Sequence, residues 1–183
     1  MGRKRPLKTA FAVAALLATG VALAVVLFKK GGAKMDAAKM KTSDDGLDLI
    51  KQFEGLRTDA YQCQANVWTI GYGHTKGVTS GMKITKEQAE QFLQQDIIAF
   101  ENAVKSTLNG VSLTQSQFDA LVSFAFNVGT SAFKSSTLAK KVKANPDDTE
   151  IASEFRRWVY ANGAVSKGLS NRREREIQLY FSK

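Results

Sequence analysis

Three residues within positions 47–75 have side chains suited to hydrolysing a glycosidic bond. Eight residues separate Glu54 from Cys63, and five separate Cys63 from Thr69. A glycosidase needs a protonated acid at the leaving oxygen and a second group on the opposite face of the sugar. Here an acid, a thiol and a hydroxyl are available. The spacing alone is a weak signal, because a glutamate at a helix end is usually just solvated.

The elements around these residues are a short helix followed by a β-like stretch. Ser43 is the expected N-cap, and the acidic residues after it suit a helix start. The helix is expected to end at Glu54 beside Gly55, a common helix stop. Residues 59–74 are rich in β-branched and aromatic residues. They are too few for an independent sheet, so we expect a small β-hairpin or three-stranded sheet packed beside helices.

The rest of the chain is helical in pattern. Two capping boxes, at 85–88 and 114–117, predict the starts of a long helix and a strongly apolar helix. These helices are expected to end near 109–110 and 127–129. Shorter helices are predicted over 136–144, 147–160 and 171–181. The expected fold class is α+β, a mostly helical domain with a small sheet at one end and a cleft where the two meet.

The N-terminal region predicts a membrane segment. Residues 9–28 are an uncharged stretch between basic flanks, long enough for a helix to cross a bilayer. Three interpretations compete: a permanent anchor, a signal peptide cleaved near Ala22-Leu23-Ala24, and a weak anchor that later leaves the membrane. The alanine content favours the third. We therefore divide the chain into a signal-anchor at 1–30, a linker at 31–42 and a catalytic domain at 43–183.

Charge and composition exclude several classes of protein. The net charge of +9 is concentrated in residues 1–41, which carry +8, so it fits membrane topology better than nucleic-acid binding. Residues 42–133 carry −4 and residues 134–183 carry +5, which suits a cleft with one basic wall. A single cysteine and a single histidine make a zinc site improbable. We expect no metal and no cofactor.

Four further motifs follow Glu54 and Cys63 along the chain: Thr69-Ile70-Gly71-Tyr72-Gly73-His74-Thr75, Phe126-Asn127-Val128-Gly129, Arg156-Arg157-Trp158 and Asn171-Arg172-Arg173-Glu174. In this order, and over essentially all of residues 44–183, the chain resembles the phage-type lysozymes, the endolysins of glycoside hydrolase family 24. The resemblance implies a lysozyme-like fold without a cofactor. It also implies cleavage of the β-1,4 bond between N-acetylmuramic acid and N-acetylglucosamine in peptidoglycan, with lysis of the bacterial host cell.

The resemblance implies roles for the three residues considered first. Glu54 matches the general acid, and Thr69 matches the threonine that positions water. Cys63 stands where the family usually has an aspartate. Some members with a weak N-terminal anchor are similar in having cysteine there. As a thiolate it would act as base, charge stabiliser or nucleophile, whereas an ordinary thiol, which titrates near ~8.5, would only orient water. A purely packing role is the alternative.

The resemblance also implies supporting residues. His74 is expected to pair with Asp96 and to be structural. Arg172 and Arg173 are expected to reach across towards Glu54. We expect four residues to contact the substrate: Thr75, Phe126, Asn127 and Thr137.

These inferences predict a monomeric phage or prophage endolysin with two partners, peptidoglycan and the membrane. The N-terminal segment would hold the domain on the periplasmic side of the inner membrane until release. Two rivals stay open. One is a muralytic transglycosylase, and the other is a catalytically weak or silent membrane-anchored wall-binding protein, suggested by Cys63.

Overall fold

A computed structural model of the protein describes residues 32–63 and 66–182. Within these residues the helices are η1 (Ala37–Lys39), α1 (Asp44–Glu54), α2 (Lys86–Thr107), α3 (Gln115–Val128), α4 (Thr130–Ser135), α5 (Thr137–Ala144), α6 (Ile151–Arg156) and α7 (Lys167–Tyr180). Three two-stranded antiparallel sheets accompany them: β1 (Met35–Asp36) with β4 (Ser112–Leu113), β2 (Arg57–Gln62) with β3 (Trp68–Gly71), and β5 (Tyr160–Ala161) with β6 (Ala164–Val165). The mostly helical α+β fold is thus confirmed.

The predicted membrane segment, residues 9–28, lies outside the described residues. Among the helices that are described, none combines the length and the apolar character needed to cross a membrane.

The two longest predicted helices begin where their capping boxes lie. In α2 the Thr85 hydroxyl accepts from the Gln88 N–H, and the Gln88 side chain accepts from the Thr85 N–H. Thr114 and Gln117 make the same reciprocal pair at the start of α3. Each box satisfies two N–H groups that the first turn of a helix leaves without a partner.

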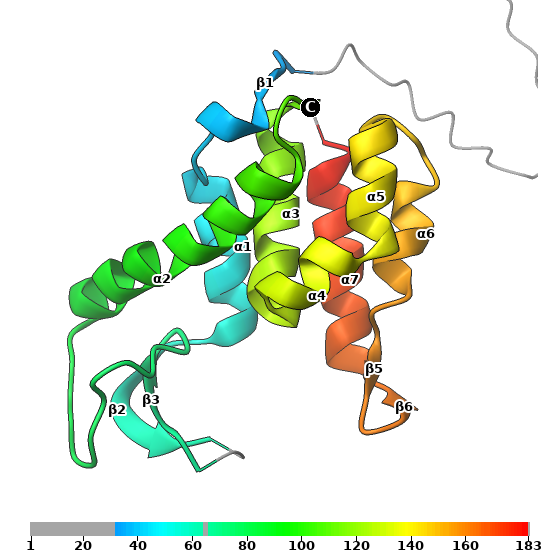
Figure 1. The fold of residues 1–183 in the computed structure, drawn as a ribbon. Helices are drawn as coiled ribbons and strands as arrows, with labels where there is room; N and C mark the ends of the chain where they lie inside the picture. The colour runs from blue at the N-terminus through cyan, green and yellow to red at the C-terminus, as the bar shows by residue number, and fades with distance from the viewer. Residues whose placement is uncertain (1–31, 64–65, 183) are drawn as a thin grey trace, which may run out of the picture.

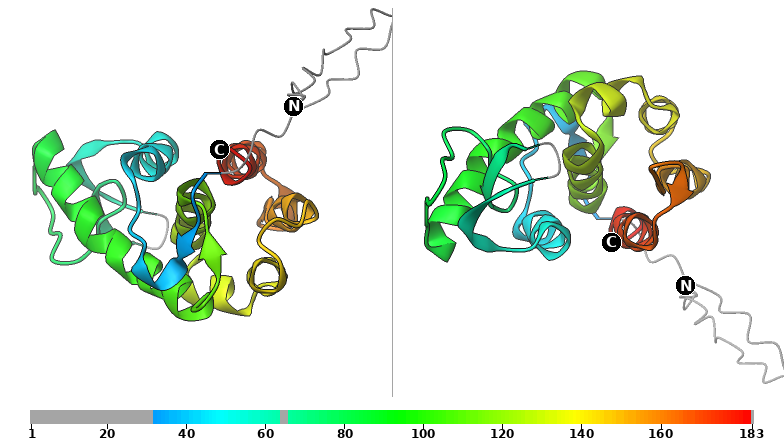
Figure 2. Two further views of the ribbon diagram at one scale, coloured as in Figure 1. Left: turned by 90° about the horizontal axis from the view of Figure 1, so that it is seen from above. Right: turned by 90° about the horizontal axis from the view of Figure 1, so that it is seen from below.

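Helix α3 is the centre of the domain. Residues 117–125 of this helix are all buried, and α3 packs against α1, α2, α4 and α7. Figure 2 shows these helices arranged around it. Because α1 and α7 both lie against α3, residues far apart in the sequence meet near its C-terminal half.

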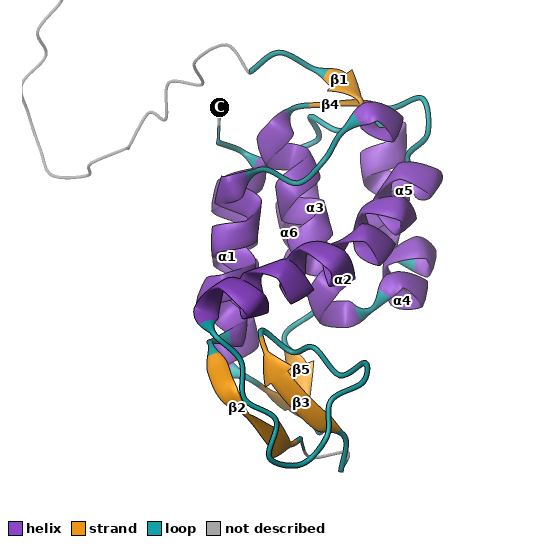
Figure 3. Ribbon diagram, turned by 90° about the vertical axis from the view of Figure 1, so that its left-hand side faces the viewer, coloured by secondary structure: helices purple, strands orange, loops and turns teal. Residues whose placement is uncertain are grey.

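The β2–β3 hairpin follows α1 directly and lies at one end of the molecule, opposite β1 and β4 (Figures 1 and 3). Tyr61 pairs with Thr69 and Gln62 with Trp68, while a bulge interrupts the ladder between Arg57 and Tyr61. This is the small hairpin that the sequence predicted.

Part of the segment assigned to a linker is packed against the helices. Its strand β1 pairs with β4, and its residues Ala37 and Met40 are buried in the core. The Thr42 N–H donates to Glu101 at 2.7 Å, and Lys34 forms an ion pair with Asp147. Residues 34–42 therefore contribute to the fold of the domain.

Two helices near the C-terminus differ from the prediction. The helix expected over 147–160 is confined to α6, because the chain then forms the β5–β6 hairpin. Asn162 and Gly163 have φ values of +51° and +78°, as a tight two-residue hairpin turn requires. Helix α7 begins earlier than expected, at Lys167, where the Ser166 hydroxyl accepts from the Leu169 N–H.

Candidate active site

Glu54 is the last residue of α1. The helix ends there because Gly55 adopts a φ of +71°, a conformation that favours glycine, and its N–H donates to the Lys51 carbonyl at 3.0 Å. The Glu54 side chain is 25% exposed, and Oε1 accepts a hydrogen bond from Arg172 Nη1 at 2.6 Å. The carboxyl group is thus held in place but still open to a substrate.

Arg172 belongs to α7, and its side chain is only 4% exposed. Besides Glu54, it donates from Nη2 to the Ser123 carbonyl and from Nε to Glu176, each at 3.2 Å. Its guanidinium also lies over the Phe53 ring, 5.4 Å from the centroid. The expected approach of Arg172 to Glu54 is therefore present in the structure.

Thr69 lies on β3 of the hairpin, and Cys63 follows the last residue of β2 directly. Thr69 is directly opposite Tyr61 in the ladder, and Cys63 comes two residues after Tyr61. The Cys63 N–H and the Thr69 hydroxyl both donate to the Val67 carbonyl at 3.0 Å. Thr69 is buried and Cys63 is half-buried. The Thr69 oxygen keeps its capacity to accept a hydrogen bond from a water.

His74 pairs with Asp96 as expected. Its Nδ1 lies 2.8 Å from Asp96 Oδ2, and its Nε2 lies 2.9 Å from the Lys76 carbonyl oxygen. The ring stacks on Phe92 at 4.3 Å. With both ring nitrogens engaged inside the protein, His74 joins α2 to the turn after β3.

Asn127 and Thr137, two of the expected substrate contacts, line neighbouring pockets. The pocket of Asn127 is formed with Val128, Arg157, Trp158, Tyr160 and Leu169. The pocket of Thr137 is formed with Ser135, Ser136, Glu154, Arg157 and Trp158. Arg157 and Trp158 belong to both. Neither was among the residues expected to contact the substrate. The Trp158 ring also meets the ring of Phe124, with centroids 5.4 Å apart.

The other two expected contacts lie elsewhere. Phe126 is half-buried and packs against Phe100, with ring centroids 4.8 Å apart. Thr75 is exposed in the turn after β3, where its carbonyl accepts from the Val78 N–H. The structure does not join either residue to the two pockets.

Arg173 does not contact Glu54, in contrast to Arg172. Its Nη2 donates to Asn127 Oδ1 at 2.7 Å, and its Nε lies 2.9 Å from Glu176 Oε2. Glu176 was not among the predicted site residues. The signal for it was its position four residues after Arg172 and three after Arg173. This spacing places all three on adjacent turns of one helix.

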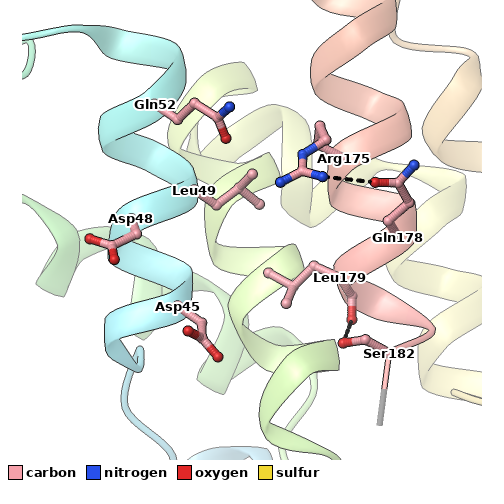
Figure 4. A pocket seen from close by; sticks show the side chains of 8 residues that line it. All are labelled: Asp45, Asp48, Leu49, Gln52, Arg175, Gln178, Leu179 and Ser182. Atoms are coloured by element: carbon pink, nitrogen blue, oxygen red, sulfur yellow. Dashed lines mark hydrogen bonds between the residues drawn. The ribbon is translucent and has the colours of Figure 1, made fainter.

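A separate pocket lies along the seam between α1 and α7 (Figure 4). Figure 4 shows Arg175 and Gln178 joined by a hydrogen bond, with Nη1 and Oε1 3.1 Å apart, on the side opposite Gln52. None of the residues predicted from the motifs lines it. Across the described part of the chain, no group of three or more His, Cys, Asp or Glu side chains is arranged to hold a metal ion.

The chain matches the family model described as phage lysozyme over residues 51–176. It is 47% identical over 147 residues to an endolysin of Acyrthosiphon pisum secondary endosymbiont phage 1, covering 78% of this chain and 99% of that protein. A SAR-endolysin of Escherichia phage P1 is 31% identical over 184 residues, covering 94% of each chain.

Among solved structures, the muramidase domain of SpmX from Asticaccaulis excentricus is similar with a TM-score of 0.74 and 39% identity. This match covers 79% of the present chain and the whole of that domain.

Proposed function

The chain belongs to the phage lysozyme family, and from this premise we propose that it cleaves the β-1,4 bond between N-acetylmuramic acid and N-acetylglucosamine with Glu54 as the general acid. The family makes it a lysozyme-type glycosidase that hydrolyses peptidoglycan. The bond cleaved and the residue roles are the content of the proposal.

One observation carries the role of Glu54: a partly exposed carboxyl group is fixed at a helix end by a buried arginine 2.6 Å away. In the proposed reaction Glu54 gives its proton to the glycosidic oxygen as the bond from that oxygen to the sugar breaks. A water molecule then attacks the sugar carbon, and the product has a reducing end.

Cys63 and Thr69 are proposed to act on the other face of the sugar. Thr69 would position the attacking water by accepting its hydrogen bond, and Cys63 would steady the positive charge that develops on the ring. The Cys63 N–H and the Thr69 hydroxyl share one acceptor, the Val67 carbonyl, and this proximity supports the pairing.

The products distinguish this function from its main rival. We expect the purified full chain to clear a suspension of peptidoglycan sacculi and to release fragments that end in reducing N-acetylmuramic acid. A transglycosylase would instead release anhydro-sugars, each lighter by one water. Mass spectrometry of the fragments before and after borohydride reduction separates the outcomes. Anhydro ends alone would refute hydrolysis, and intact sacculi would support the silent wall-binding alternative.

We also propose that residues 9–28 anchor the enzyme in the inner membrane until its release to the periplasm. The match to the P1 SAR-endolysin takes in 94% of this chain, so it must include most of that segment. After pulse-labelling, the full chain should move from the membrane to the soluble fraction without losing mass. A smaller soluble product would indicate cleavage instead.

A further inference from the structure

Glu176 is a fully buried carboxylate in the middle of α7, and the proposed reaction does not use it. Both its side chain and that of Arg173 are 0% exposed. Its Oε1 accepts from the Ser123 hydroxyl at 2.9 Å and from Arg172 Nε at 3.2 Å. Its Oε2 lies 2.9 Å from Arg173 Nε. One acceptor group therefore meets both arginines of the helix.

Stability alone is a poor reason for such a cluster. Removing charged groups from water is costly, and well-packed apolar side chains of similar volume often stabilise a core as well or better. Burial raises the pKa of Glu176 and lowers that of Arg173, which are the directions expected when a charge loses its hydration.

Hydrogen bonds through the two arginines connect Glu176 to two parts of the site. In the first connection, Arg172 donates from Nε to Glu176 and from Nη1 to Glu54, the latter at 2.6 Å. In the second connection, Arg173 Nη2 donates both to Glu176 Oε1 at 3.3 Å and to Asn127 Oδ1 at 2.7 Å. Because each guanidinium is planar, fixing one of its N–H groups also restricts the direction of the others.

We propose that Glu176 is a positioning residue that sets Glu54 through Arg172 and Asn127 through Arg173. The inference rests on the proposed function and deepens it, since it assigns the placement of the acid and of a substrate contact to one buried group. Glutamine has the same shape but offers an N–H₂ group to one of the two arginines. Glu176→Gln therefore disturbs these hydrogen-bond connections while nearly preserving side-chain volume.

The test is a double-mutant cycle in the purified full chain, with soluble uncrosslinked peptidoglycan strands as substrate. Glu176→Gln should lower kcat by about 10- to 100-fold, the cost of a small misplacement of a reacting group. In an Arg172→Lys background, which cannot transmit the orientation, the same change should alter kcat less than about threefold. In that background, the remaining effect of Glu176→Gln should be a change in KM, because the connection through Arg173 to Asn127 is still disturbed.

The pH profile supplies a readout that loss of fold alone would not produce. The groups that face Glu176 are Arg172 and Arg173 on its own helix and the Ser123 hydroxyl on α3. Glu54 faces Arg172. Removing the negative charge of Glu176 leaves more uncompensated positive charge beside Glu54. The alkaline limb of activity, where the acid loses its proton, should therefore move to lower pH.

Glu174→Gln is the matched control, because Glu174 lies on the same helix but is 48% exposed and pairs with Arg156 at the surface. It should leave kcat, KM and the pH profile unchanged. If Glu176→Gln fails to fold, Ser123→Ala removes only one hydrogen bond to Glu176 and should lower kcat severalfold. Equal kcat losses in both backgrounds, with an unmoved pH profile, would overturn the proposal. Failure of the proposed function would appear separately, as an active Glu54 variant.

Discussion

Replacing Glu54 with glutamine is expected to slow peptidoglycan cleavage by about 100- to 10,000-fold, the contribution of a positioned general acid. The amide cannot supply the proton that the leaving oxygen needs. The amide keeps an oxygen that can accept the hydrogen bond from Arg172 Nη1, which is 2.6 Å long with Glu54. The measurement is the initial rate of clearing of sacculi, with thermal unfolding recorded on the same samples.

Asp59→Asn is the control for this prediction. Asp59 is the next carboxylate along the chain after Glu54, but its side chain is 62% exposed on β2 and pairs with Lys83 at 2.7 Å. Asp59 takes part in a surface ion pair, and such pairs contribute little. The Asp59→Asn variant should therefore clear sacculi at the unaltered rate. A fully active Glu54 variant together with an inactive Asp59 variant would contradict the assignment of Glu54 as the general acid.

Local signals explain how much of the fold was predictable. Both capping boxes were visible as short motifs, and the helices begin at them. The Asn162-Gly163 pair is an equally local signal for a hairpin turn, and strand β5 before it begins at the last residue of the helix predicted over 147–160. The packing of Ala37 and Met40 had no such signal, because η1 contacts α2 and the adjoining β1 pairs with β4, both far along the chain.

The residues of the candidate site likewise divide into those with a local sequence signal and those without one. Glu54, Cys63 and Thr69 were found because they lie within one short stretch and match the motif of a family. The contact of Arg172 with Glu54 joins residues 118 positions apart, so only the family resemblance pointed to it. Nothing in hydrophobic patterning distinguishes Arg173, which turns inward to Glu176, from an exposed arginine, since charged residues on a helix are usually exposed.

Cys63→Ser is expected to lower kcat by at least about 100-fold if the sulfur steadies charge or bonds to the sugar. Serine is close in size, but its hydroxyl does not ionise at neutral pH. The hydrogen bond from residue 63 to the Val67 carbonyl is donated by the backbone N–H, so a serine at this position can still make it. The loss would thus report on the side chain. The measurement is kcat on soluble peptidoglycan strands, with unfolding temperature as the check on fold.

Cys63→Asp separates the chemical roles of that side chain. By resemblance the family usually has an aspartate here, so this variant should keep activity within about tenfold of the original chain if residue 63 supplies negative charge. If the sulfur is instead a covalent nucleophile, mass spectrometry of the acid-quenched original protein should detect a sugar adduct on Cys63. Because the chain has a single cysteine, any thiol-linked adduct has one location.

Full activity of Cys63→Ser would reduce Cys63 to a packing residue, and Thr69 would then carry the placement of water. Thr69→Val tests that division, because valine keeps the shape at a buried position and removes the hydroxyl that donates to Val67. A large loss in the valine variant beside an active serine variant would assign the opposite face of the sugar to Thr69. Loss in both would mean that thiol and hydroxyl act together on the same water.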